Sequence, residues 1–135
     1  MDRDGVQAWL DSYVEAWRSY DPDAIGALFA QDAEYRYHPW DEPVRGRAAV
    51  VASWIEPEGS ASGRDEPGTY DARYEPFVVS GSRAVATGWS RYWTDASRTA
   101  VRDTYRNCYL LVFDDDGRCT SFTELFMREP GGAGR

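Results

Sequence analysis

The sequence predicts an α+β protein in which three helices come first and a long-stranded, strongly curved antiparallel sheet follows. Two observations carry this prediction. Apolar residues recur at helical spacing as far as residue 55, and four runs rich in β-branched and aromatic residues, separated by short turns, fill residues 70–128. The order of elements lacks the regular βα alternation that a doubly wound parallel sheet needs. An α+β roll is therefore expected.

The first helix has the clearest pattern in the chain. Its apolar residues recur at i, i+3, i+4, i+7, i+8 and i+11 and form one stripe along the helix: Val6, Trp9, Leu10, Tyr13, Val14 and Trp17. A second helix begins at Asp21-Pro22, where a capping carboxylate precedes a proline, and it extends to about Gln31. A third helix follows Gly46, which serves as its N-cap, and ends before Pro57.

Strand periodicity begins at Ala33, where apolar and polar residues start to alternate. This alternation predicts a short first strand that ends at His38-Pro39-Trp40. Short turns rich in Gly, Ser and Asp separate the later β-rich runs, so these should form a meander of hairpins. The four long strands are expected near residues 70–79, 83–94, 100–113 and 118–128.

The composition indicates one domain over residues 1–135, with its core in residues 6–128. A chain of 135 residues has room for one hydrophobic core, and its 42% apolar and 15% aromatic content is ample to fill it. Residues 57–69 are rich in Gly, Ser and charge, which predicts a mobile loop near the mouth of a pocket. The tail, 130–135, has no apolar anchor and should fray.

Charge and residue usage exclude several function classes. Fifteen basic and 23 acidic residues give a net charge of −8, which disfavours binding to nucleic acids or anionic membranes. The chain contains no lysine, so Schiff-base chemistry is excluded. One histidine and two cysteines are too few for a zinc site, and no cofactor is implied. The charged N-terminus and the lack of a long apolar run predict a cytoplasmic protein.

Four segments resemble the nuclear-transport-factor-2-like superfamily, which includes ketosteroid isomerases, SnoaL-like polyketide cyclases and noncatalytic members. The segments are the first helix with Tyr13, DPDAIGALFAQDAEYRYHP, VRGRAAVVASW and LVFDDDGRCTSFTELF. The resemblance covers residues 6–128 and marks a fold rather than a chemistry. It implies a cone-shaped, mixed or antiparallel sheet whose wide end is closed by the helices over an apolar pocket.

The resemblance also implies site residues. The isomerases of this superfamily use a tyrosine on the first helix, a carboxylic acid on the penultimate strand and a base at the end of the first strand. Tyr13 matches the tyrosine, and Tyr109 lies at the position of the acid. The base position falls on His38, or on Tyr37 if no residue is inserted. Because two of the three groups differ, the pocket would hold a hydroxyl pair and one imidazole instead.

Hairpin register predicts which side chains share the pocket. A turn at residues 114–117 that pairs Phe113 with Arg118 places Asn107 opposite Glu124 and Tyr109 opposite Phe122 on one face. The same register keeps the two cysteines too far apart for a disulfide. Three further arguments complete the expected lining. Strand alternation adds Asp103, Tyr105 and Phe126, and a register that pairs Arg91 with Asp103 adds Trp89 and Trp93. The third helix adds Trp54.

Each catalytic candidate has a functional and a structural interpretation. His38 carries the side chain whose ordinary pKa best suits proton transfer near neutrality, but it could equally be a structural strand end. Glu124 could have a raised pKa and act as acid or base, or be satisfied by Asn107. Tyr13 and Tyr109 could donate to a developing oxyanion, or be core tyrosines. An Arg91–Asp103 contact is more simply a structural ion pair.

Two functions follow from these residues. The first is a cofactor-independent enzyme that acts on a small, largely apolar, oxygenated molecule by proton transfer, in an isomerisation, cyclisation or dehydration. The second is a noncatalytic ligand-binding or dimeric interaction module with the same pocket. Hydrolysis of an epoxide would need a carboxylate pair, for which only Asp103 and Glu124 are available.

The outward face of the last two strands predicts a homodimer. By alternation, an apolar set points away from the pocket: Cys108, Leu110, Val112, Leu125 and Met127. Because an antiparallel sheet with one wet face normally shows polar residues there, a second subunit is expected to cover this face.

Overall fold

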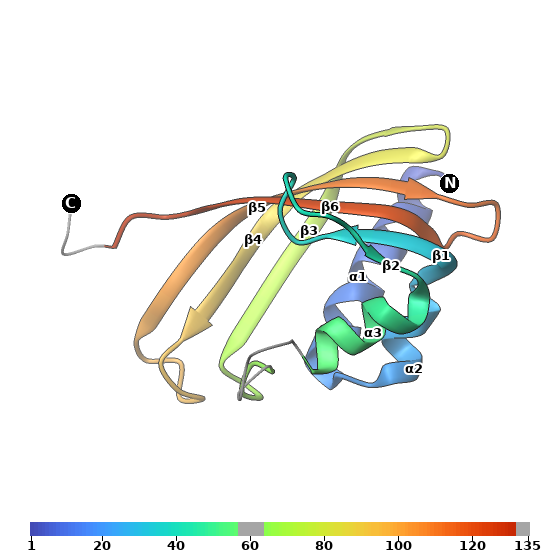
Figure 1. Ribbon diagram of the computed structural model, residues 1–135. Helices are drawn as coiled ribbons and strands as arrows, with labels where there is room; N and C mark the ends of the chain where they lie inside the picture. Colours follow the sequence, from blue (N-terminus) through green and yellow to red (C-terminus); the bar gives the residue numbers. More distant parts are fainter. Residues whose placement is uncertain (57–63, 132–135) are drawn as a thin grey trace.

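The computed structural model describes residues 1–56 and 64–131, which form a curved, unclosed six-stranded sheet with three N-terminal helices against its concave side (Figure 1). This confirms the predicted fold class. The predicted mobile loop, 57–69, and frayed tail, 130–135, lie in part outside the described residues, at 57–63 and 132–135.

The bounds of the three helices follow from their capping residues and from the start of the sheet. Helix α1 (Arg3–Ser19) starts at Asp2, whose carboxylate accepts a hydrogen bond from the Gly5 backbone N–H at 2.8 Å. Its apolar stripe is buried as predicted except for Trp17, which is half-buried. Helix α3 (Arg47–Ile55) follows Gly46, whose φ of 91° is a left-handed value that favours glycine. Helix α2 (Pro22–Ala27) ends about four residues earlier than predicted, because the chain enters the sheet at Phe29.

The sheet has the strand order β2-β1-β6-β5-β4-β3 and is mixed. The four long strands form the predicted antiparallel meander: β3 (Tyr70–Ser80), β4 (Arg83–Trp93), β5 (Val101–Phe113) and β6 (Cys119–Arg128). Strand β1 (Phe29–Arg36) begins four residues before the predicted Ala33 and pairs parallel with β6. A short strand, β2 (Val44–Arg45), was not predicted; it pairs with β1.

The predicted register of the β5–β6 hairpin is wrong by two residues. Tyr109 pairs with Glu124, and Asn107 pairs with Phe126, because an irregularity at Val112 brings Phe113 opposite Cys119. A slip of two residues leaves every side chain on its predicted face, since side chains alternate with a period of two. The inward set is therefore preserved.

The predicted β4–β5 register is wrong by one residue, and this error exchanges the faces of β4. Arg91 pairs with Thr104 and Tyr92 pairs with Asp103. Ser90 and Tyr92 therefore face the concave side. Trp89 lies on the outer face with Arg91, whose guanidinium carbon is 5.4 Å from the centre of the Trp89 indole.

An aromatic core joins α1 to the concave face of the sheet. The Tyr13 ring stacks on Phe122 at 5.5 Å, and Phe122 stacks on Tyr35 of β1 at 4.3 Å. Trp9 contacts the same Phe122 from the preceding turn of α1.

No helix among the described residues is both long and apolar enough to cross a membrane.

Gly88 provides a test of how closely β3 and β4 approach. A Cβ atom at Gly88 would lie 2.0 Å from the Arg73 carbonyl oxygen and 2.6 Å from Cδ1 of Tyr74. Gly88→Ala should therefore lower the free energy of unfolding by about 3 kcal/mol, because backbone atoms must move. Urea denaturation measures the change. Gly131→Ala, where a Cβ meets nothing within 4 Å, is the control, and equal midpoints for both variants would contradict the prediction.

Candidate functional site

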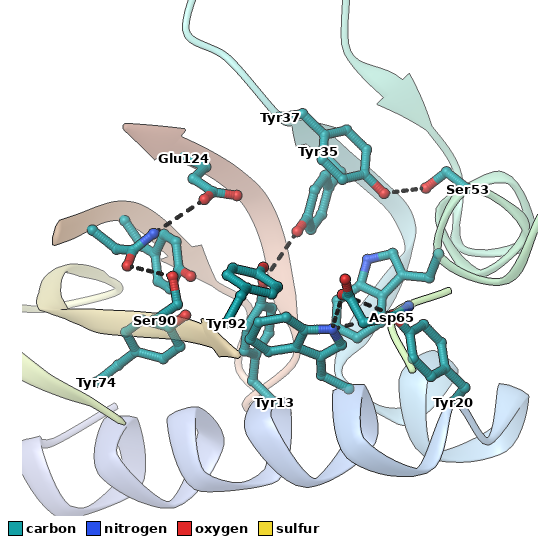
Figure 2. A pocket seen from close by; sticks show the side chains of 14 residues that line it. Tyr13, Tyr20, Tyr35, Tyr37, Ser53, Asp65, Tyr74, Ser90, Tyr92 and Glu124 are labelled. Atoms are coloured by element: carbon teal, nitrogen blue, oxygen red, sulfur yellow. Dashed lines mark hydrogen bonds between the residues drawn. The ribbon is translucent and has the colours of Figure 1, made fainter. Parts of the chain in front are cut away.

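A cavity of about 240 Å³ opens on the concave side of the sheet, between the sheet and helices α1 and α3 (Figure 2). Fourteen residues line it, of which seven are tyrosines and two are tryptophans. The polar remainder consists of two serines, one asparagine and two carboxylates, so neither arginine nor histidine is in the lining. The cavity is thus an aromatic chamber whose rings alternate with hydroxyl, amide and carboxyl groups.

Glu124 is the carboxylate at the sheet side of this cavity. Strand β6 turns it inward, and its Oε2 accepts a hydrogen bond from Nδ2 of Asn107 at 3.3 Å. Asn107 is oriented in turn by Ser90, whose hydroxyl donates to Asn107 Oδ1 at 3.1 Å. Burial raises the pKa of Glu124 to about 7, although the Asn107 hydrogen bond and the nearby His38 act to lower it. A carboxyl group with this pKa can either take up or release a proton near neutrality.

Two tyrosine hydroxyls meet beside this carboxyl group. The hydroxyl of Tyr13 lies 3.2 Å from that of Tyr35, and both side chains are buried. Burial raises the pKa values of Tyr13, Tyr35 and Tyr109 well above that of a free phenol. These hydroxyls are therefore neutral near pH 7 and able to donate hydrogen bonds. Tyr35 was not predicted as a site residue, because strand alternation alone does not tell a core tyrosine from a lining one.

A second carboxylate, Asp65, lies at the other side of the cavity (Figure 2). Its Oδ2 accepts hydrogen bonds from Nε1 of Trp17 at 3.1 Å and from the Tyr20 hydroxyl at 3.2 Å. The Asp65 backbone N–H also donates to the Tyr20 oxygen at 3.0 Å. Sequence reasoning missed Asp65, since it stands in a segment rich in charge and glycine with no pattern that assigns it to a face.

His38 lies at a separate, outer cavity of about 510 Å³ beside β6. Its Nδ1 is 2.9 Å from Oδ2 of Asp41, and its backbone N–H donates to the same oxygen at 3.1 Å. Asn107 and Glu124 line both cavities, so they form the boundary between them. The expectation that His38 would share the inner cavity with Tyr13 is therefore wrong, because β1 ends before His38 and the chain turns outward.

The structure brings together half of the ten predicted site residues. Phe122 lies just beneath them, with its ring 4.8 Å from that of Tyr109. Five line the inner cavity: Tyr13, Trp54, Asn107, Tyr109 and Glu124. The indole Nε1 of Trp54 is buried without a hydrogen-bond partner in the described part of the chain.

Three predicted site residues lie elsewhere. Trp89 is on the outer face, as the register of β4 requires. Tyr105 is adjacent to the lining, with its ring edge-on to Tyr92 at 5.8 Å. Asp103 forms ion pairs with Arg102 at 3.0 Å and Arg128 at 3.5 Å, so the predicted pair with Arg91 is wrong. The Arg91 Nε instead donates to the Thr104 hydroxyl.

Metal-binding chemistry has no visible basis in residues 1–56 and 64–131. Within those ranges, histidine, cysteine and carboxylate side chains nowhere gather in groups of three or more. Both cysteines are free thiols, Cys108 half-buried and Cys119 buried.

Comparison with known proteins identifies the family to which the chain belongs. Residues 10–122 match the SnoaL-like domain family, so the chain belongs to that family. No curated protein sequence matches the chain.

Solved structures share the fold at low sequence identity. An NTF2-like protein of unknown function from Mesorhizobium loti is 24% identical, with a TM-score of 0.63 over 94% of this chain and 95% of that one. An LEH-like epoxide hydrolase of M. tuberculosis is 14% identical, with a TM-score of 0.63 over 93% of this chain and 84% of its own. A putative ketosteroid isomerase from Kribbella flavida is 16% identical, with a TM-score of 0.63 over 97% and 86%. These likenesses establish the fold.

The raised pKa of Glu124 makes stability depend on pH. Its pKa is about 7 in the folded chain and near 4.5 when exposed, so the folded state binds the proton more tightly. Stability should therefore be greatest below pH 4.5 with respect to this group, and should fall by roughly 3 kcal/mol as pH rises to about 7. Urea unfolding at pH 5.0 and 7.5 measures the loss. Glu124→Gln, which cannot ionise, should remove most of it, and an unchanged pH dependence in this variant would contradict the assignment.

Proposed function

We propose that the chain is a cofactor-independent enzyme that binds a small, largely apolar, oxygenated molecule in the inner cavity and catalyses proton transfer on it. The reaction class is an isomerisation, cyclisation or dehydration that passes through an enol or enolate. The observation that carries this proposal is Glu124, a carboxyl group with a pKa of about 7 in an aromatic cavity beside neutral hydroxyl donors. Membership of the SnoaL-like family supports it.

Each lining group has a distinct task in this mechanism. Ionised Glu124 removes a proton from a carbon next to a carbonyl group, and the resulting acid returns the proton at the position where the product needs it. As negative charge develops on the carbonyl oxygen, the hydroxyl of Tyr13 or Tyr109 donates a hydrogen bond to it. The Asn107 amide holds Glu124 in position through its 3.3 Å contact.

His38 serves as a proton relay in the proposal, not as the primary base. Asp41 engages Nδ1 of His38, which leaves Nε2 as the exchanging atom. Because Glu124 lines both cavities, a proton on it can pass outward through His38 to solvent. This assignment takes Glu124 rather than His38 as the group that meets the substrate.

The alternative function is a noncatalytic module that binds a ligand in the same cavity. The small volume and the many ring contacts around Tyr13 favour it, since they suit a largely filled interior. Epoxide hydrolysis through Asp103 and Glu124 lacks support, because Asp103 is outside the cavity lining.

Hydrogen exchange distinguishes the enzyme from the binding module. The probe is 2-tetralone, a compact ketone with acidic α-hydrogens, followed by NMR in D₂O. We expect the protein to accelerate α-hydrogen exchange, with a rate that rises as pH increases through about 7, because the base must be ionised. Glu124→Gln should slow the exchange at least 100-fold.

Glu75→Gln is the matched control. It makes the same chemical change at an exposed position on the face of β3 that points away from the cavity. Exchange no faster than in buffer, or equal rates for the wild type and Glu124→Gln, would refute the catalytic proposal. Saturable binding of 2-tetralone without exchange would support the noncatalytic module.

We also propose that two copies associate through the outer face of β5 and β6. Leu110, Leu125 and Met127 are exposed there, with Met127 78% exposed, and Cys108 pairs with Leu125 between them. Trp89 and Arg106 are paired on the adjoining strands, and aromatic and arginine side chains are enriched at protein interfaces. A second copy would bury this apolar surface.

The cytoplasmic location stays a prediction.

Light scattering at micromolar concentration tests the dimer. The wild type should have twice the 15.3 kDa mass of one chain, and Leu110→Glu should be monomeric, because it puts a charge into the apolar contact. Asp115→Ala, in the exposed β5–β6 turn, should leave the mass unchanged. A wild-type species of 15.3 kDa would overturn the dimer.

A further inference from the structure

The Asp65 side of the inner cavity is built differently from the Glu124 side. Its lining rings are Trp17 and Tyr20 from the end of α1 and Tyr92 from β4. The Trp17 and Tyr92 rings meet edge to face at 6.0 Å, and Trp17 also stacks on Tyr70 at 4.5 Å. The cavity there is bordered by half-buried aromatic rings and one half-buried carboxylate.

The lining of the cavity holds two carboxyl groups and no basic side chain. The titratable groups of its lining are tyrosines and two carboxylates, and none of the fourteen lining residues is basic. In the described part of the chain, neither Asp65 nor Glu124 takes part in an ion pair with an arginine. Burial raises the pKa of Tyr92, and the negative charges of both carboxylates raise it further. An anionic ligand would meet repulsion from both sides of the cavity.

Helix α1 adds to this negative potential at the Asp65 side. Its carboxyl end lies at Tyr20, whose backbone N–H closes the helix on the Ala16 carbonyl at 2.8 Å. Helix carboxyl ends carry a partial negative charge that favours nearby cations. Tyr20 itself has φ = 50°, a left-handed value that is costly for a residue other than glycine. This backbone conformation holds the Tyr20 ring and hydroxyl at the cavity.

We propose that the ligand of this cavity carries a positively charged nitrogen, an alkyl- or arylammonium group, which lies against Asp65 among the rings of Trp17, Tyr20 and Tyr92. Aromatic faces attract cations through the negative charge above each ring, and a carboxylate among such rings supplies the counter-charge. The inference rests on the proposed function, since it takes the cavity as a ligand site. It specifies the substrate class as an oxygenated molecule with an amine at the end remote from Glu124.

A competing role for Asp65 is purely structural, since its contacts with Trp17 and Tyr20 also tie its segment to α1. Arg64 also contacts this group of residues. Its guanidinium carbon lies 5.4 Å from the centre of the Tyr20 ring, and that of Arg102 lies 5.1 Å from the centre of the Tyr92 ring, so two of the three rings already contact a cation of the protein. Asp65→Asn separates the two roles, because asparagine keeps an acceptor oxygen for Trp17 and Tyr20 but removes the negative charge.

The experiment uses three probes with one skeleton: trimethyl(2-phenylethyl)ammonium, neutral 3-phenylpropanamide and anionic 3-phenylpropanoate. Calorimetry at pH 7.5 in 150 mM salt gives their affinities. We expect the ammonium probe to bind about tenfold more tightly than the amide, and the carboxylate probe more weakly than either. In Asp65→Asn, affinity for the ammonium probe should fall about tenfold while affinity for the amide stays unchanged. Asp115→Asn, at the exposed β5–β6 turn, should behave as the wild type.

Equal affinities for the ammonium and amide probes, no measurable binding of the ammonium probe at millimolar concentration, or an Asp65→Asn variant that changes both affinities alike would overturn the inference. These results are independent of turnover. Ammonium binding without exchange of 2-tetralone would refute the enzyme and leave this inference standing, whereas exchange without a preference for the cation would refute only the inference.

Discussion

The burial of the aromatic stripe of α1 against the concave face of the sheet is the interaction on which the rest of the structure depends. Tyr13 is at its centre, with ring contacts to Trp54, Tyr74, Tyr109 and Phe122 at 5.1 to 6.0 Å. These partners come from α3, β3, β5 and β6, so one side chain links the helices to three strands of the sheet. Large rings cannot fill such a curved interior completely, and the inner cavity is the space that remains beside them.

The same aromatic surroundings shift the pKa values of the groups in the site. A carboxyl group on an exposed strand would ionise near its ordinary pKa, but Glu124 is withdrawn from water and its pKa rises to about 7. Burial also keeps the neighbouring phenols neutral, so that they serve as donors. The acid, base and hydrogen-bond donor of the proposed mechanism thus share one physical cause, desolvation, with no basic side chain in the lining.

The two carboxylates of the cavity differ in what surrounds them. Glu124 has one amide donor and adjoins the outer cavity of His38, an arrangement suited to proton exchange. Asp65 accepts hydrogen bonds from an indole and a phenol at the carboxyl end of α1, an arrangement that holds its side chain in place. The proposed ligand is oriented by this difference, with its reactive carbon toward Glu124 and its charged nitrogen toward Asp65. The chain shares its fold with the SnoaL-like family, and in the proposal these side chains give the chamber its selectivity.

Local patterns in the sequence determined the helices, the long strands, the fold class and the inward face of β5 and β6, because periodicity and caps act over a few residues. They also placed Tyr13 on the buried stripe of the first helix. Asn107, Tyr109 and Glu124 were placed inward correctly, since an error of two residues in the hairpin leaves faces unchanged. Only the tertiary structure decided the register of β4, the outward turn at His38 and the place of Asp65. These depend on contacts between distant segments: an error of one residue in register moves Trp89 to the opposite face, and the position of Asp65 follows from hydrogen bonds to Trp17 and Tyr20, more than forty residues away.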